Sequence, residues 1–271
     1  MEIGEIELND FLEAVHTRYG YDFTDYAPAS VKRRIVHFMG GTRFSSLEVL
    51  KKQLLEDEHF FEQFVREISV TVTEMFRDPT YYKSLRDNVM KRLATYPVIK
   101  IWVAGCATGE EAYSMAIMLK EENLLHRSII YATDINQRSL GIAKNATYPL
   151  EYMKLYTSNY IQAGGTQAFS EYYTAKYDSA LFDKSLQMHI VFSPHNLVTD
   201  RMFNEFQLIT CRNVLIYFNQ ALQNKVINLF YESLCPFGFM GLGNRESLLF
   251  TDKKDCFEET DKNERIFMKY K

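Results

Sequence analysis

The chain has 271 residues, of which 46% are hydrophobic, 14% aromatic and 24% charged. This composition is ordinary for a folded protein with one large core or two domains. The 31 Lys and Arg residues against 35 Asp and Glu residues give a formal net charge of -4, whereas a nucleic-acid-binding protein usually carries a basic excess. The charge balance therefore argues against a nucleic-acid partner.

Neither a targeting signal nor a membrane segment is predicted. The first seven residues are acidic and lack the positively charged start of a signal peptide, and no apolar run approaches the roughly 18 residues of a membrane span. The four cysteines form no CxxC pair, which is typical of reduced, buried thiols rather than of a disulfide framework or a zinc site. We expect a cytoplasmic protein that is not embedded in a membrane and binds no metal.

Residues 1–70 are predicted to form a small helical domain. Apolar residues recur at helical spacing in successive segments, the first of which ends at Gly20 and the second of which follows Pro28. A third helix is predicted to begin at Ser45, where Glu48 stands at the spacing of a capping box. No strand pattern interrupts this region.

Residues 71–271 have a different pattern, in which short apolar runs alternate with helical segments. The runs typical of strands are 98–104, 128–133, 188–193, 207–210 and 239–242, and the helical segments between them include 110–119, 137–143 and 220–234. This alternation predicts a doubly wound α/β domain with a parallel sheet. Residues 144–187 break the rhythm, and we expect them to form a small antiparallel β insertion. Tyr172, Tyr173 and Tyr177 are expected in its core, and a role in partner binding is the alternative.

A glycine-containing turn between a predicted strand and helix is the strongest local indication of a ligand site. Gly105 and Gly109 let the backbone turn sharply and approach a ligand. The next predicted strand ends in Asp134, whose carboxylate would accept hydrogen bonds from both hydroxyls of a ribose. Taken singly, the glycine turn is also compatible with a tight turn that binds no ligand, and Asp134 is also compatible with an N-cap of the next helix. Their order along the chain favours an adenosine-containing ligand.

The charge beside this turn separates two adenosine-containing cofactors. NAD carries a pyrophosphate, which is bound by a third glycine and by free amides at a helix N-terminus. In this chain Gly109 is followed by Glu110 and Glu111, which would repel a pyrophosphate. S-adenosylmethionine instead carries a cationic sulfonium and amino group, which suit neighbouring carboxylates. The sequence therefore favours methyl transfer over hydride transfer.

Five ordered segments of the chain carry recognisable motifs. They are TEMFRDP at 73–79, AGCATGEEAYS at 104–114, TDI at 133–135, HNL at 195–197 and CRNVLIYF at 211–218. Together with GLGNRESL at 241–248 and the helical stretch 26–35, they resemble the chemotaxis receptor glutamate methyltransferase (CheR) family over nearly the whole chain. The resemblance implies a class I S-adenosylmethionine-dependent methyltransferase, with a Rossmann-like doubly wound sheet, a small N-terminal all-α domain and a small β insertion.

The same resemblance implies an activity and a partner. A methyl group would pass from S-adenosylmethionine to glutamate side chains of chemotaxis receptors in sensory adaptation, giving γ-methyl esters and S-adenosylhomocysteine. The partner would be the cytoplasmic helical region of a receptor or a similar acidic helical protein, and the enzyme would be a monomer. Because a glutamate side chain, with a pKa of about 4.3, is already ionised at neutral pH, no general base is required. A catalytically weak or inactive S-adenosylmethionine-binding adaptor of the same fold is the alternative.

Position by position, the resemblance implies a cofactor site and a catalytic pair. Glu111 would meet the methionine amino group, Asp134 the ribose, and Asn196 with its neighbour the adenine. Arg77 and Tyr217 would lie closest to the reacting methyl group, with the planar guanidinium of Arg77 orienting a carboxylate. The full set of expected cofactor contacts is Thr71, Thr73, Arg77, Gly105, Glu111, Asp134, Asn196, Leu197, Arg212 and Asn213.

Four departures from the family pattern and one basic cluster complete the expectations. Met75 replaces a common aromatic residue, and Arg245 stands where the family often has serine. Thr71 stands where the family commonly has Asn, and Gln207 stands where an Asp precedes the Cys-Arg-Asn motif, so that a charge is lost near the expected cofactor end of the sheet. Lys32, Arg33 and Arg34 follow one another in the second helix. An acidic receptor helix could dock on them by charge complementarity, and an ordinary solvated helix face is the alternative.

Overall fold

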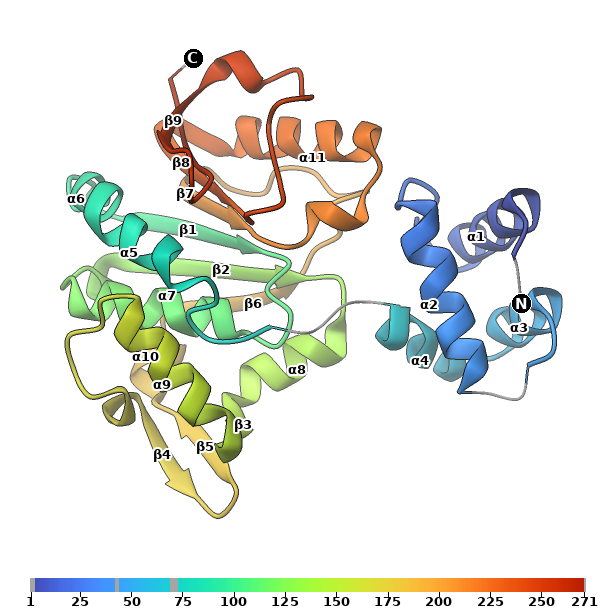
Figure 1. The fold of residues 1–271 in the computed structure, drawn as a ribbon, viewed down its shortest axis with the longest axis horizontal. Helices are drawn as coiled ribbons and strands as arrows, with labels where there is room; N and C mark the ends of the chain where they lie inside the picture. The colour runs from blue at the N-terminus through green and yellow to red at the C-terminus, as the bar shows by residue number, and fades with distance from the viewer. Residues whose placement is uncertain (1–2, 42–43, 69–72, 271) are drawn as a thin grey trace.

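The computed structural model describes residues 3–41, 44–68 and 73–270 (Figure 1). Thr71, one of the expected cofactor contacts, lies outside the described residues. In the part of the chain that is described, no helix has the length and apolar character that crossing a membrane requires.

The N-terminal region is helical, as predicted. Its elements are α1 (Glu5–Tyr19), α2 (Pro28–Gly40), α3 (Leu47–Glu56) and α4 (Glu58–Ile68). Their apolar faces share a separate core that includes Phe11, Val15, Ile35, Leu50 and Phe64. The predicted capping box at Ser45 is wrong by one residue, because the hydroxyl of Ser46 accepts the hydrogen bond from the backbone N–H of Val49.

The remainder of the chain is built on a sheet with the strand order β6-β2-β1-β7-β8-β10-β9 among the described residues. The strands are β1 (Ile99–Ala104), β2 (Ser128–Asp134), β6 (Ile190–Pro194), β7 (Phe206–Cys211), β8 (Leu234–Leu242), β9 (Phe257–Asp261) and β10 (Ile266–Lys269). Strands β6, β2, β1, β7 and β8 are parallel, whereas β10 runs antiparallel to β8 and β9. The five predicted strands are therefore confirmed, and the closing hairpin of β9 and β10 was missed.

Both faces of the sheet are covered, as expected for a doubly wound fold. Along β1, Ile101 and Val103 join a core with α5 (Pro79–Asn88) and α7 (Glu110–Glu121), whereas Trp102 and Ala104 join a core with α11 (Gln220–Ser233). This alternation follows from the period of two of a strand. The other helices of this part are α6 (Met90–Leu93), α8 (Gln137–Asn145) and the 3-10 turns η1 (Leu125–Arg127), η4 (Leu215–Tyr217) and η5 (Lys254–Cys256).

The insertion is a small antiparallel sheet with its own helix. It consists of β3 (Thr147–Pro149), η2 (Leu150–Tyr152), α9 (Met153–Gln162), η3 (Phe169–Tyr172), β4 (Tyr173–Lys176), β5 (Ser179–Phe182) and α10 (Lys184–Gln187), with strand order β3-β5-β4. The small β insertion is confirmed. One detail is wrong, because Tyr172 is buried and Tyr173 half-buried, but Tyr177 is 88% exposed at the hairpin tip.

The carboxyl ends of four parallel strands meet at one edge of the sheet. Strand β1 runs into Gly105, β2 ends in Asp134, β6 leads to His195, and β7 leads to Arg212. Ligands of open α/β sheets bind at this edge. The predicted position of Gln207 at the cofactor end is wrong, because it lies at the opposite end of β7. There its side-chain oxygen accepts a hydrogen bond of 2.7 Å from the backbone N–H at the start of β1.

Candidate functional site

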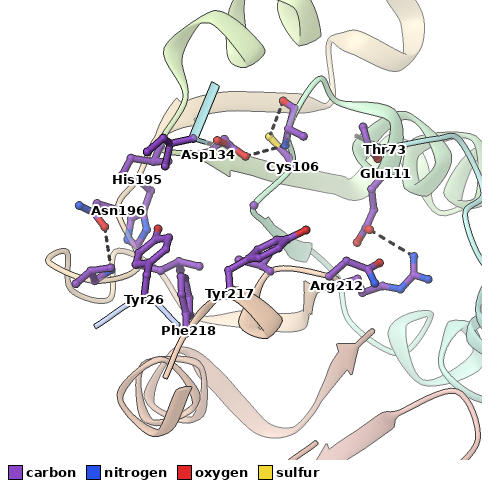
Figure 2. A pocket seen from close by; sticks show the side chains of 18 of the residues that line it. Tyr26, Thr73, Cys106, Glu111, Asp134, His195, Asn196, Arg212, Tyr217 and Phe218 are labelled. Atoms are coloured by element: carbon purple, nitrogen blue, oxygen red, sulfur yellow. Dashed lines mark hydrogen bonds and ion pairs between the residues drawn. The ribbon is translucent and has the colours of Figure 1, made fainter. Parts of the chain in front are cut away.

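A cavity of about 280 Å³ lies at this edge of the sheet, between the strand ends and the helical domain (Figure 2). Every expected site residue that the structure describes lines it, namely Thr73, Arg77, Gly105, Glu111, Asp134, Asn196, Leu197, Arg212, Asn213 and Tyr217. Segments separated by more than a hundred residues thus contribute to one pocket. The roles expected for these residues stay predictions.

The glycine turn is clamped against the end of β2. The backbone N–H groups of Gly105 and Cys106 both donate to the Thr133 carbonyl, at 2.8 and 2.9 Å. Gly105 has φ +75°, and a Cβ on it would lie 2.4 Å from a methyl group of Val214. A side chain is therefore excluded both by the left-handed backbone and by the neighbouring loop.

Asp134 holds the same turn from the other side. One of its carboxylate oxygens accepts from the N–H of Ala107 and the other from the N–H of Asn136, each at 2.8 Å. Burial raises the pKa of Asp134, while these backbone donors act to lower it. The idea that Asp134 caps the next helix is wrong, because the side chain of Asn136 caps α8. Each carboxylate oxygen keeps a second lone pair with which to accept from a ribose hydroxyl.

The opposite end of the cavity is charged. Arg212 is buried and forms ion pairs with Asp78 at 2.8 Å and with Glu111 at 3.4 Å. Its guanidinium also donates to the Arg77 carbonyl and lies 4.0 Å from the ring centre of Tyr81. Burial alone would lower the pKa of Arg212, but the Glu111 and Asp78 carboxylates and the nearby tyrosines raise it above its ordinary value. Asp78 therefore pairs with Arg212.

Glu111 has one buried carboxylate oxygen, Oε1, that finds no hydrogen-bond partner among the described residues. An unpaired buried acceptor is costly, and at a cavity wall it suits a cationic donor. Glu110 is different, because it is buried beside the hydroxyls of Thr108 and Tyr156 and does not line the cavity. Of the two adjacent glutamates, Glu111 is therefore the one placed to meet an ammonium group.

The segment that carries Arg77 has an unusual backbone. Phe76 and Asp78, on either side of it, have φ of +52° and +55°, a conformation that costs non-glycine residues roughly 1–2 kcal/mol each. The buried ring of Phe76 fixes this turn against aromatic neighbours, and its N–H donates to the Ser114 hydroxyl at 2.9 Å. The strained turn places Arg77 at the cavity wall.

Tyr217 projects into the middle of the pocket from η4. Figure 2 shows it between Tyr26 and Arg212, with its hydroxyl directed toward the Glu111 end. The guanidinium of Arg34, from α2, lies 4.4 Å from its ring centre and also donates to the Ile68 carbonyl. Arg34 is half-buried and lines the cavity. It therefore does not belong to a solvated basic face with its two neighbours.

Glu246 holds the loop from which Tyr217 projects. Its carboxylate is 4% exposed and accepts four backbone N–H groups: Val214 at 2.8 Å and Ile216 at 3.3 Å on one oxygen, and Gly243 at 2.6 Å and Asn213 at 3.1 Å on the other. Burial raises the pKa of Glu246 and the backbone donors act to lower it. This glutamate stands in GLGNRESL at 241–248, one of the segments that resemble the family, and its role depends on tertiary contacts that the sequence does not show.

The residues of the cavity fit S-adenosylmethionine. In Figure 2 the carboxylate of Glu111 lies at one end, Asn196 and His195 lie at the other, and Asp134 and Tyr217 lie between them. Leu197 and Val198, buried and apolar, line the same end as Asn196. An acceptor for an ammonium, an acceptor for ribose hydroxyls and a partly apolar end thus follow one another in the order of the groups along this cofactor. The unpaired Glu111 oxygen is the observation that favours a cationic ligand.

Comparisons with known proteins agree with the geometry. Residues 6–69 match the family described as CheR methyltransferase, all-alpha domain, and residues 71–266 match CheR methyltransferase, SAM binding domain. The chain is 48% identical over 265 residues to a Pseudomonas putida protein named "Putative methyltransferase Cher3", covering 98% of this chain and 97% of that one. It is 30% identical to the chemotaxis protein methyltransferase of Listeria innocua, covering 88% and 89%. It is 24% identical to that of Escherichia coli, covering 89% and 84%.

Proposed function

We propose that this chain, which belongs to the CheR methyltransferase family, methylates glutamate side chains of chemotaxis receptors and forms γ-methyl esters. S-adenosylmethionine is the cofactor of the domain that residues 71–266 match, so the predicted cofactor and fold class are confirmed. The relatives named chemotaxis protein methyltransferases support a receptor as the substrate.

One observation carries the choice of a carboxylate substrate. Two arginines from different parts of the chain, Arg34 on α2 and Arg77 on the strained turn, both line the cavity that contains Tyr217. Cations at the wall attract an anionic side chain, and the planar guanidinium can orient a carboxylate. In the described residues the cavity wall has one histidine, His195, whose ring packs against Trp102 and Phe203 at the far end. A substrate that is ionised beforehand requires no base.

The chemistry then depends on orientation and on the exclusion of water. S-adenosylmethionine supplies, when bound, a methyl group on a cationic sulfur. Glu111 would hold its amino group and Asp134 its ribose, while Asn196 and Leu197 would flank its adenine. Arg77 would orient the incoming carboxylate, and Tyr217 would shape the pocket at the reacting methyl group. Attack by a carboxylate on a sulfonium cancels charge, so a dry pocket that holds both groups in line favours the reaction.

A test of this function is to incubate the protein with labelled S-adenosylmethionine and receptor cytoplasmic fragments. Base-labile label on the receptor is the expected result, because a methyl ester is hydrolysed by base whereas a methylated amine is not. Arg77→Ala and Tyr217→Phe should transfer methyl groups more slowly, and Tyr177→Phe at the exposed hairpin tip serves as the matched control. Wild-type turnover in both site variants would remove these residues from the mechanism.

The receptor would dock on the remaining basic residues of α2. Lys32 is half-buried and Arg33 exposed, so both can meet acidic residues of a receptor helix by charge complementarity. Replacing both with glutamate should raise KM for the receptor and leave cofactor affinity unchanged. The same reversal at Lys91, exposed on α6, is the control. An unchanged KM in the Lys32 and Arg33 variant would refute docking on this face.

The rival is an adaptor of the same fold that binds S-adenosylmethionine without transferring its methyl group. Two measurements on the same protein distinguish the enzyme from the adaptor: cofactor binding by calorimetry, and transfer of labelled methyl groups to receptor fragments. Binding with transfer supports the enzyme, and binding without transfer to any receptor supports the adaptor.

A further inference from the structure

The wall of the cavity crosses from one domain to the other. Alongside the residues at the strand ends, it includes Phe23, Tyr26, Arg34 and Ile68 of the helical region. The expectations from sequence placed every cofactor contact after residue 70. The helical domain therefore contributes to a pocket that lies partly outside residues 71–266, the part that matches the S-adenosylmethionine-binding domain.

The helical domain is fixed to the pocket by backbone contacts. Tyr26 and Phe218 form an antiparallel bridge, and the N–H of Ala27 donates to the Tyr217 carbonyl at 2.8 Å. Asn219 donates from its backbone to the Asp25 carbonyl at 2.8 Å and from its side chain to the Asp25 carboxylate at 3.1 Å. These contacts hold the helical domain against the same segment that carries Tyr217.

Tyr26 lies at the end of the cavity opposite Glu111. Figure 2 places it next to His195 and Asn196, with its hydroxyl turned toward Asp134. Its ring is held edge-on against Phe218, 4.9 Å between ring centres, and against Phe23 at 5.1 Å. Burial and, to a smaller degree, the Asp134 carboxylate raise the pKa of the Tyr26 hydroxyl, which therefore stays protonated and can donate.

This end of the cavity has the chemistry of a purine site. Leu197 and Val198 are buried and apolar. The half-buried ring of Tyr26, backed by the buried ring of Phe23, supplies a flat surface of the kind against which a base packs favourably. The charged groups Glu111 and Arg212 are at the other end. An adenosine group therefore suits this end and an amino-acid group does not.

We infer that Tyr26, supported by Phe23, covers the adenosine moiety of the cofactor, so that the helical domain completes the cofactor site. This inference rests on the proposed function for the identity of the ligand and adds a contact from the all-α domain. Because the ligand then touches both domains, its binding and the docking of the helical domain on η4 stabilise each other by the same free energy.

Hydrogen exchange on the full-length protein tests this without any substitution. The probe is S-adenosylhomocysteine, and the expected result is slower amide exchange in residues 23–34 as well as in 104–111 and 195–198. Protection confined to the latter two segments would overturn the inference. A failure to methylate receptors would leave this measurement unaffected, so the two proposals fail separately.

Calorimetry on variants gives a second test. Tyr26→Ala should weaken binding of both S-adenosylhomocysteine and 5′-methylthioadenosine by about tenfold, a loss of about 1.4 kcal/mol, whereas Tyr26→Phe should retain affinity because the ring remains. The control is Tyr19→Ala, which removes a ring stacked 3.8 Å from Phe61 in the same domain but away from the cavity. Unchanged affinity in Tyr26→Ala, equal losses in Tyr26→Ala and Tyr26→Phe, or an equal loss in the control would each overturn the assignment.

Discussion

Replacing Glu246 with glutamine should destabilise the loop 213–217 that carries Tyr217, although Glu246 itself does not line the cavity. Each carboxylate oxygen of Glu246 accepts two backbone N–H groups, at distances between 2.6 and 3.3 Å. In glutamine one oxygen becomes an NH₂ group, which would face two donors. Hydrogen bonds to a charged acceptor contribute about 1.5–3 kcal/mol each, so the loss of two should cost about 3 kcal/mol of unfolding free energy. For a chain of this size that lowers Tm by roughly 6–12 °C.

Thermal unfolding and methyl transfer together test this reasoning. We expect Glu246→Gln to lower kcat by at least about tenfold, because the segment 213–217 no longer fixes Tyr217 and small misplacements are costly. Cofactor affinity should change less than kcat. The control is Glu258→Gln on β9, where the side chain is exposed. A Tm within about 2 °C of wild type, or an unchanged kcat, would show that Glu246 does not position this loop.

Three further outcomes follow from the contacts of the site and of the insertion. Arg34→Ala should lower kcat roughly tenfold, since a partly buried cation–π contact contributes about 1–2 kcal/mol. The control, Arg18→Ala, removes an exposed contact of the same kind and should not change kcat. Equal kcat values in the two variants would refute the role of Arg34. Gly105→Ala should abolish S-adenosylhomocysteine binding and destabilise the fold by at least about 2 kcal/mol, because the alanine Cβ would clash with Val214. Wild-type affinity of this variant in calorimetry would contradict the prediction. Glu121→Gln should make unfolding less sensitive to acid. Burial acts to raise the pKa of Glu121, but hydrogen bonds from Tyr160, Thr166 and Arg86 lower it below 4.5, so its stabilisation is complete above that pH and is lost as the pH falls through the lowered pKa. If the difference in unfolding free energy between wild type and Glu121→Gln does not become smaller below pH 4.5, this explanation is wrong.

The parts of the fold that the sequence predicts are those with a strong local signal. The apolar runs that become β1 and β7 are buried on both faces of the sheet, and β2 alternates buried with half-buried residues, so these runs are largely apolar and easily found. The turn at Gly105 and the acid at Asp134 are also local features. The last hairpin was missed because β9 reads FEETD, in which only Phe257 is buried, and an edge strand of this kind has no apolar pattern.

The errors at the site have a common cause, which is that sequence spacing does not reveal what an element docks against. Because Arg34 follows two other basic residues, the sequence alone groups it with them, although its guanidinium lies over the ring of Tyr217. Tyr26 and Glu246 were seen only as parts of motifs, since their roles depend on contacts with residues 217–218 and 213–216. Gln207 is a different case, because it opens the predicted strand 207–210, and in a parallel sheet the first residue of a strand lies opposite the carboxyl edge where ligands bind.

The central claim is that one cavity holds S-adenosylmethionine with its amino group on Glu111. The most direct measurement compares two ligands by calorimetry in wild type and in Glu111→Gln: S-adenosylhomocysteine, which has the amino group, and 5′-methylthioadenosine, which lacks it. We predict that the substitution weakens the first by at least about tenfold and leaves the second unchanged. Equal weakening of both ligands, or no binding of S-adenosylhomocysteine to the wild-type protein, would contradict the account.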